Sequence, residues 1–184
     1  MYKRQVLALC KYAKLGVVRY QQGFRAAISF GLGVFITFSQ AHGADIGLIV
    51  LAAFGFALGL GGGSLVFVRK AGLNPLQELP IAALALLVGM FAALSFANTE
   101  SQLQSFTSLV SAWGVISGAF ELYQARRNGF KSAAGKDYLL SAVFALLLGL
   151  LFLAVPLDEV SAVGFFGAYL ALSGVHPVSY THLR

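Results

Sequence analysis

The feature that most constrains this chain is a series of six long apolar runs joined by short polar connections. A helix needs about 20 residues to cross the hydrocarbon core of a bilayer, and the runs reach or approach that length. Backbone N–H and C=O groups in lipid must be satisfied within the segment, which selects helix over strand at these lengths. We therefore predict an all-α membrane protein with six transmembrane helices, which cover Phe24–Ala41, Ile46–Val68, Leu79–Phe96, Leu103–Tyr123, Tyr138–Val155 and Val160–His176.

The composition agrees with a membrane domain. Of the 184 residues, 58% are hydrophobic and 11% are charged, whereas soluble domains average roughly 25% charged residues. The lone Cys10 excludes an intrachain disulfide, and we interpret it as an ordinary small apolar residue, with juxtamembrane lipidation as the weaker alternative. The net charge of +6 does not indicate nucleic-acid binding here, because the basic residues lie between apolar runs.

The distribution of charge predicts how the chain is threaded through the membrane. All 13 Lys and Arg residues lie before the first run or at its start, where Arg25 is the second residue, after the second run, after the fourth, or at the end of the chain. The other connections contain no Lys or Arg, and they carry the acidic residues Asp45, Glu100, Asp158 and Glu159. Because positively charged loops stay in the cytoplasm, both termini are predicted to be cytoplasmic.

The chain divides into a basic N-terminal segment, a six-helix transmembrane domain and a tail, at residues 1–23, 24–176 and 177–184. Met1–Gln5 and Pro177–Arg184 resemble translated sequencing-adapter read-through, so we expect both to be non-native and the natural protein to extend beyond them. Genuine polar tails are the alternative. Val6–Phe24 gathers apolar residues on one helix face, which favours either a basic amphipathic helix at the headgroups or a disordered basic lead-in.

The second, fourth and sixth runs share a short motif, an aromatic residue followed by small residues and a glycine. The three copies are Phe54–Gly59, Trp113–Gly118 and Tyr169–Gly174. The odd-numbered runs share a glycine late in the run, at Gly33, Gly89 and Gly149. A period of about 56 to 60 residues indicates one supersecondary unit used three times. We predict three repeated helical hairpins, each with an acidic turn at one end and a basic tail at the other.

The glycines predict where helices pack. Inside lipid, close approach of helix backbones at small residues drives association. We expect such contacts along two stripes, Gly55, Gly59 and Gly63 in the second run and Gly114 and Gly118 in the fourth. Leu170 replaces the first glycine of the motif in the sixth run, so we expect a looser contact there.

Glu121 is the only carboxylate within the six runs. Charged groups inside a membrane are costly and are candidates for function. Glu121 precedes Arg126 and Arg127 by about 8 Å along a helix axis, so it can be either an interfacial anchor or a proton or substrate site. Trp113 lies in the middle of its run, too deep for an interfacial belt, and is predicted to be a packing residue.

Two further motifs do not indicate a phosphate-binding or metal-binding site. Gly59–Ser64 reads GLGGGS but lacks the lysine of a phosphate-binding loop and the strand that should precede it, so a locally weakened helix or a tight crossing is favoured. His42 and Asp45 share one turn without further metal ligands, which favours a solvated turn. We predict no catalytic residue, no cofactor site and no metal site.

The combination of three hairpins, late glycines in the odd runs, WGVISGAFELYQARR in the fourth run and LLLGLLFLAVP before Pro156 resembles the HdeD-like short-repeat membrane proteins. The resemblance covers about Arg19 to His176, and it departs at Ser39–Ala41 and at Gly59–Ser64. It implies a bacterial inner-membrane protein linked to acid resistance.

Two functions follow as hypotheses. The first is a non-enzymatic, multi-pass membrane protein that supports acid or stress resistance, with the lipid bilayer, copies of itself or other membrane proteins as partners. The alternative is a small transporter or channel for protons or a solute, motivated by the repeats, by Glu121 and by the broken-looking stretch at Gly61–Gly63.

Overall fold

The computed structural model describes residues 23–40, 42–67 and 75–181. The first 22 residues, which include Cys10 and most of the predicted amphipathic segment, lie outside this part of the chain. All regular secondary structure within the described residues is helical. The helices are Gly23–Phe38, here called the first helix, followed by α2 (Ala44–Phe67), α3 (Pro75–Ser95), the short 3-10 helix η1 (Thr99–Ser101), α4 (Gln102–Asn128), α5 (Ala133–Ala154) and α6 (Glu159–Thr181).

The six predicted helices are confirmed, but several ends differ, since α4 ends at Asn128 rather than Tyr123 and α5 begins at Ala133 rather than Tyr138. The helix α2 continues without interruption through Gly61–Gly63, and Gly59 packs closely against Leu86 and Ala82 of α3, so of the two expected alternatives the tight crossing fits and the local weakening does not. Its Ser64 hydroxyl donates to the Gly61 carbonyl at 3.0 Å, a bond that stays within the helix. The helix α6 runs on through Pro177, past the end that we predicted at His176.

Not every helix is equally suited to lipid. Three stretches are long and apolar enough to cross a membrane, Ala44–Ser64, Glu78–Ser95 and Ala134–Ala154. Within the described residues the first helix and Glu159–Val175 are apolar but shorter. The helix α4 is long enough but carries more polar residues than these stretches. Six crossings therefore remain a prediction, while a helical bundle with membrane-compatible helices is observed.

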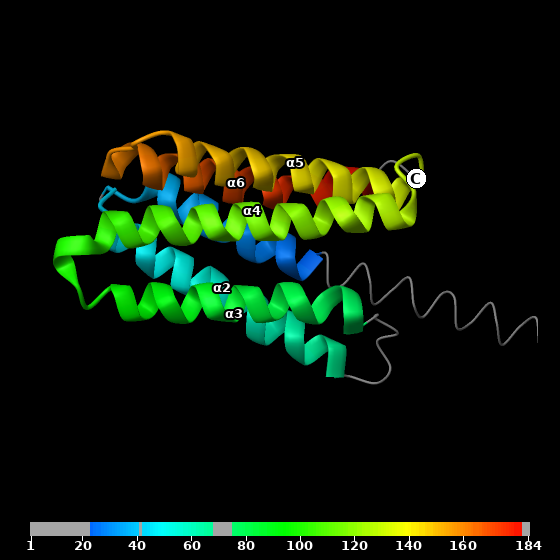
Figure 1. Cartoon of the computed structure of the whole chain (residues 1–184), viewed down its shortest axis with the longest axis horizontal. Helices are drawn as coiled ribbons and strands as arrows, with labels where there is room; N and C mark the ends of the chain where they lie inside the picture. The colour runs from blue at the N-terminus through cyan, green and yellow to red at the C-terminus, as the bar shows by residue number, and fades with distance from the viewer. Residues whose placement is uncertain (1–22, 41, 68–74, 182–184) are drawn as a thin grey trace, which may run out of the picture.

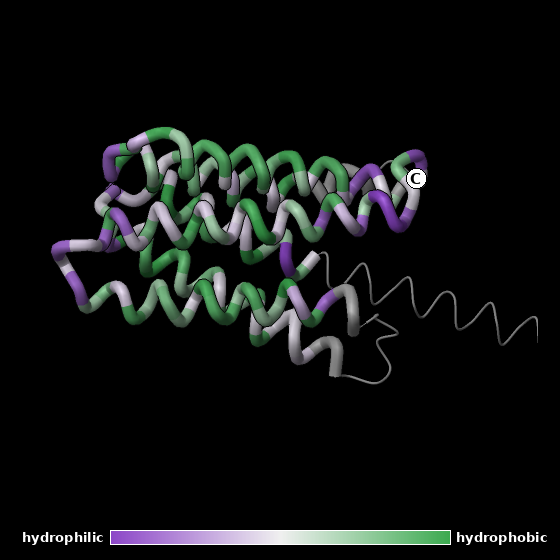
Figure 2. Tube along the Cα trace, viewed as in Figure 1, coloured by the Kyte–Doolittle hydropathy of each residue, from purple (hydrophilic) through white to green (hydrophobic). Residues whose placement is uncertain are grey.

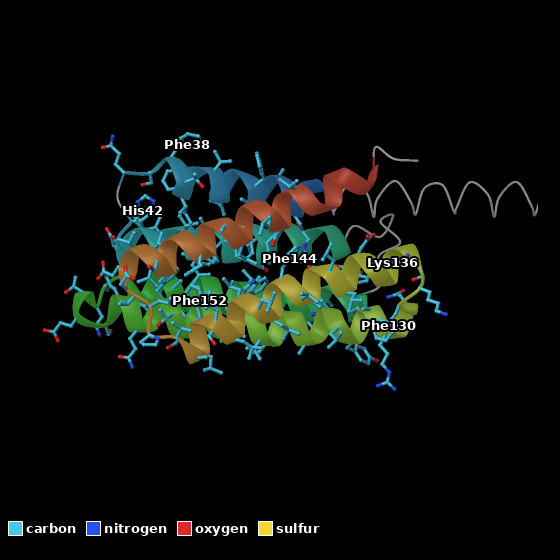
Figure 3. The ribbon with its side chains drawn as sticks, turned by 90° about the horizontal axis from the view of Figure 1, so that it is seen from above. Phe38, His42, Phe130, Lys136, Phe144 and Phe152 are labelled. Carbon is cyan, nitrogen blue, oxygen red and sulfur yellow. The ribbon has the colours of Figure 1, made fainter. Side chains whose placement is uncertain are left out.

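The long helices run alongside one another, and Figure 1 shows their turns gathered at the two ends of the bundle. Figure 2 shows hydrophilic segments at both ends and hydrophobic segments between them. We name the ends by their charges. The acidic end holds Asp45, Glu100, Asp158 and Glu159, and the basic end holds Arg126, Arg127, Lys131 and Lys136. In Figure 3, Phe38 and His42 mark the acidic end, and Phe130 and Lys136 mark the basic end.

The closest helix pairs are not the predicted hairpins. The most extensive contacts join α2 to α3 and α4 to α5, whereas α3 with α4 and α5 with α6 touch less. The unit that packs tightly is therefore a helix together with the next helix across a basic connection. A third close pair is formed by α6 and the first helix, which are far apart in the sequence, because Gly33 lies against Ala171. The start and the end of the bundle thus close on each other.

The glycine crossings follow the sequence motif. A Cβ at Gly55 would lie 2.6 Å from Gly89 Cα, and one at Gly114 would lie 2.6 Å from Gly149 N. The third crossing is equally close, because a Cβ at Gly33 would lie 2.6 Å from Ala171 N.

The expectation of a looser contact at Leu170 is therefore wrong. A Cβ at Gly174 would lie 2.5 Å from Phe30 N, so glycines on both helices allow the close approach that the missing motif glycine does not. The Leu170 side chain itself is fully buried in the core.

The aromatic residues of the motif meet in the core. The rings of Phe54 and Trp113 pack edge to face, with centroids 5.2 Å apart. The Trp113 indole Nε1–H donates to the Tyr169 hydroxyl at 3.3 Å. Phe166 packs against Phe54 with centroids 6.2 Å apart. Edge-to-face pairs of this kind add to the stabilisation from burial, so α2, α4 and α6 are joined by aromatic contacts, as predicted for Trp113.

Candidate functional site

The helix α4 turns its polar side chains toward the other helices. Ser111, Ser117, Glu121 and Gln124 are all buried, and their spacing of three or four residues after Ser117 places them on one face. The Ser111 hydroxyl donates to the Gly149 carbonyl of α5 at 3.0 Å. The Ser117 hydroxyl donates to the Trp113 carbonyl of its own helix. These polar side chains thus lie on the buried face of α4, while Ile116, Leu122 and Tyr123 on the same helix are exposed.

Glu121 is the charged member of this face, and only 5% of the residue is exposed. It lies two turns before the end of α4, near the basic end. Its Oε1 is 3.5 Å from Nη2 of Arg25, which belongs to the first turn of the described part of the first helix. The Ser141 hydroxyl of α5 also hydrogen-bonds to the carboxylate. Three helices therefore meet at this carboxylate.

Further polar groups surround the pair. Glu78, in the first turn of α3, lies close enough to interact electrostatically with Glu121. Tyr138 of α5 interacts with both carboxylates and with Arg25. We call these residues the basic-end cluster, namely Arg25, Glu78, Glu121, Tyr138 and Ser141.

The ion pair is unequal in its exposure. The side chain of Arg25 is 31% exposed, whereas that of Glu121 is 7% exposed. Charge-assisted N–H···O bonds are normally about 2.7–2.9 Å long, so the contact at 3.5 Å is a loose one. A buried charge is tolerated only when it is paired and hydrogen-bonded. Glu121 therefore depends on Arg25 and Ser141, while Arg25 keeps a share of its hydration.

The sequence predicted that Glu121 lies within a membrane-crossing run but left open whether it anchors at the interface. In the structure its side chain lies between helices and pairs with Arg25, and no described contact joins it to Arg126 or Arg127. Arg25 was interpreted as a topology signal and its pairing was missed. The available signal was that Arg25 and Glu121 are the only Asp, Glu, Lys or Arg residues inside the six predicted runs.

The candidate glycines fall into two groups, those that pack closely against another helix and those that have space for a side chain. Gly55, Gly59, Gly114 and Gly118 all face another helix so closely that a Cβ would clash. Gly63 is different, because a Cβ there would lie 3.9 Å from the Ala82 Cβ, an ordinary contact distance. Gly61 lies against the Phe24 ring, and Gly62 has open space beside it. The stretch Gly59–Ser64 is therefore part of a regular helix whose glycines differ in how closely the neighbouring residues approach them.

At the acidic end, the carboxylates accept hydrogen bonds from backbone N–H groups and not from a charged side chain like that of Arg25. Glu159 Oε2 accepts a hydrogen bond from the Ala44 N–H at 3.4 Å, which links α6 to the start of α2. Asp158 Oδ2 accepts one from the Ser161 N–H at 3.3 Å. The Ser161 hydroxyl and N–H bonds lower the pKa of the exposed Asp158 carboxyl below its ordinary value. The Asp158 carboxyl therefore favours its ionised form.

The described residues contain no group of three or more His, Cys, Asp or Glu placed to hold a metal ion. Neither a protein-family model, nor a curated protein, nor a solved structure matches the chain. The likeness to the HdeD-like proteins therefore stays a proposal carried by the sequence pattern.

Proposed function

We propose that this chain is a non-enzymatic, multi-pass protein of the bacterial inner membrane, of the HdeD-like type, which supports survival under acid or related stress. All six helices would cross the bilayer, with both termini and the basic end in the cytoplasm. The bundle supports this arrangement because its hydrophilic segments gather at the two ends (Figure 2).

Its flanks expose large apolar side chains, as a lipid-facing surface requires. They include Phe35, Leu60, Leu94, Leu147 and Leu153. Because these residues belong to the first helix and to α2, α3 and α5, lipid would contact the bundle on several sides.

The closely packed aromatic core of the bundle is the observation that supports a structural role over a transport role. A pathway along the bundle between α2, α4 and α6 would have to pass Phe54, Trp113 and Phe166. These rings are buried and pack edge to face in an unbroken set. Phe106 extends the set toward Phe152 on α5, with ring centroids 6.1 Å apart. Interiors packed in this way leave no room for water or solute along the axis.

The repeat is part of the proposal. The three glycine crossings use equivalent motif positions, because a Cβ at the late glycine of each odd-numbered helix would meet the backbone N of the third motif residue. The contacts are Gly89 with Phe56, Gly149 with Val115, and Gly33 with Ala171. The next contact along each pair also corresponds, since Gly59 meets Leu86, Gly118 meets Leu146, and Gly174 meets Phe30. This correspondence supports one helix pair used three times around a common core.

The test is a deletion of the gene in its native host, followed by acid shock and counting of survivors. We expect the deletion strain to survive less well than its parent, and a plasmid copy of the wild-type gene to restore survival. A complementing copy with Gly114→Val, which would disrupt a crossing, should fail to restore it. Equal survival of the deletion strain and its parent would count against the proposal.

The alternative, a small proton or solute transporter, is favoured by one observation, the buried charge of Glu121 beside Arg25. Intramembrane ionisable pairs of this type often lie on ion pathways. Proteoliposomes containing the wild type or Glu121→Gln would separate the two functions. Proton or solute flux that depends on Glu121 would favour transport over the structural role.

A further inference from the structure

We propose that the basic end of the α4–α5 pair binds the headgroup of an anionic phospholipid, whose acyl chains lie along the outer face of α4. The headgroup site combines four exposed cations with two exposed aromatic residues, namely Arg126, Arg127, Lys131, Lys136, Tyr123 and Phe130. This binding rests on the membrane placement in the proposed function, whose lipid partner it specifies. It does not rest on which leaflet the basic end faces.

The four cations have no acidic side chain that neutralises them. Among the described residues, none of the four forms an ion pair. The chain has seven Asp and Glu residues, and all of them lie in the described part, so the rest of the chain holds no acidic side chain that could pair with the cations. Asp137 is the one acid among residues 126–137, which carry four cations and therefore a net charge of plus three. Such a patch favours an anionic partner.

The loop between α4 and α5 is fixed by its own hydrogen bonds. Gly129 turns the chain with a φ of 82°, a value that favours glycine. The Ser132 hydroxyl donates to the Gly129 carbonyl at 2.8 Å and accepts from the Gly135 N–H at 2.9 Å, which caps the start of α5. The loop therefore presents Phe130, which is 47% exposed, at a defined place beside the cations. Figure 3 shows Phe130 and Lys136 at the same end of the bundle.

The outer face of α4 is graded from apolar to cationic. Ile116, Phe120, Tyr123 and Arg127 follow one another at spacings of three or four residues, so they share one helix face. Ile116 and Tyr123 are 52% and 58% exposed. The order along the face is aliphatic, aromatic and then basic, which is the order that acyl chain, interface and phosphate follow in a phospholipid.

The length of this face also suits a lipid. Eleven residues separate Ile116 from Arg127, which is about 16 Å along a helix axis. One leaflet contributes about 15 Å of hydrocarbon to a bilayer. A lipid whose phosphate lies at Arg127 can therefore keep its acyl chains against apolar side chains of α4.

The chemistry of the cations favours an anionic lipid over a zwitterionic one. The guanidinium groups of Arg126 and Arg127 match phosphate oxygens in pairs, and the Lys131 and Lys136 ammonium groups add charge. A zwitterionic headgroup brings its own ammonium group, which the neighbouring cations repel, whereas an anionic headgroup brings none. The connections at the acidic end contain no Lys or Arg, so the preference belongs to the basic end.

The experiment is native mass spectrometry of the full chain in a neutral detergent, titrated with phosphatidylglycerol or with phosphatidylcholine of the same acyl chains. We expect phosphatidylglycerol to be retained at the lower concentration. Arg126→Gln with Arg127→Gln should weaken its retention by about fivefold or more, whereas Arg126→Lys with Arg127→Lys keeps the charge and should lose less. Equal retention of the two lipids by the wild type would leave the cations to an acidic protein partner and would overturn the proposal.

Thr99→Glu with Gln104→Glu is the matched control, because both positions are exposed at the acidic end and the variant lowers the net charge by the same amount. It should keep the wild-type preference, and an equal loss in this variant would contradict a site at the basic end. Glycerol phosphate, which lacks acyl chains, should not displace the lipid at equal concentration. Displacement would assign the cations to a free phosphate and would also overturn the proposal. Acid survival is not a readout here, so this test and the test of the proposed function can fail independently.

Discussion

The two ends of the bundle use the same chemical group in opposite ways. At the acidic end, Asp158 and Glu159 accept hydrogen bonds from the starts of α6 and α2 while they remain in contact with water. At the basic end, Glu121 is withdrawn between helices and is held by Arg25 and Ser141. The difference teaches that position along the bundle, rather than residue type, decides whether an acid remains in water or depends on a charged partner.

The largest expected effect comes from removing the cation at the basic end. Arg25→Met should destabilise the protein by about 3 kcal/mol, the lower limit for breaking a buried pair, because Arg25 is partly exposed. The double variant Arg25→Met with Glu121→Met removes both charges and should recover most of that loss. Equilibrium unfolding in mixed micelles measures both. A double variant as unstable as the single one would show that the carboxylate is not the source of the loss.

The two ends belong to one bundle, whose helices approach one another most closely at the glycine crossings between them. Gly114→Ala should cost about 2 kcal/mol, because backbone atoms of Ala145 and Gly149 occupy the space of the new methyl group. Gly62→Ala is the matched control on α2, since open space lies beside it, and it should be neutral or stabilise by up to about 1 kcal/mol. The same unfolding assay applies. Equal effects at both glycines would mean that the crossing is not a close contact.

A smaller effect is expected from the link between helices at the acidic end. Glu159→Gln keeps an acceptor for the Ala44 N–H but loses the charge, so it should cost less than about 1 kcal/mol. Glu159→Ala should cost about 1 kcal/mol, because the N–H at the start of α2 loses its partner. Unfolding of the two variants side by side separates charge from hydrogen bonding. A loss as large as that of Arg25→Met would erase the distinction between the ends.

The smallest effect is a pH dependence at Asp158. The pKa of its carboxyl is lowered by the Ser161 bonds, so its stabilising contribution is present above the ordinary value near 3.8 and is lost as the pH falls through the lower folded value. Thermal unfolding of the wild type and Asp158→Asn should therefore differ slightly at neutral pH and converge in strong acid. A difference that grows on acidification would have the wrong sign.

The sequence predicted the helices well because the length of an apolar run is a local property. Each predicted run overlaps one helix to within a few residues at most ends, and the glycines that mark crossings were also visible. The choice of partner helix was not, because periodicity locates a face without saying which helix covers it. Hairpins joined by acidic turns were therefore expected where pairs joined across basic connections are found.

The candidate site was predicted only in part for a similar reason. Glu121 stood out as a carboxylate inside an apolar run, but Arg25 is 96 residues away in the chain, and its place near the start of a run made it look like a topology signal. Leu170 shows the limit of motif reasoning, since Gly33 and Gly174 supply from both helices the space that the motif glycine would have provided.

The most direct test of the account is the sidedness of the two ends in a cell membrane. With Cys10→Ser as background, Glu100→Cys and Lys131→Cys place one thiol at each end, and a membrane-impermeant maleimide is added to intact cells. The account predicts that the thiol at position 100 reacts from outside and that the thiol at position 131 reacts only after the cells are opened. Reaction of both thiols from the same side would contradict it.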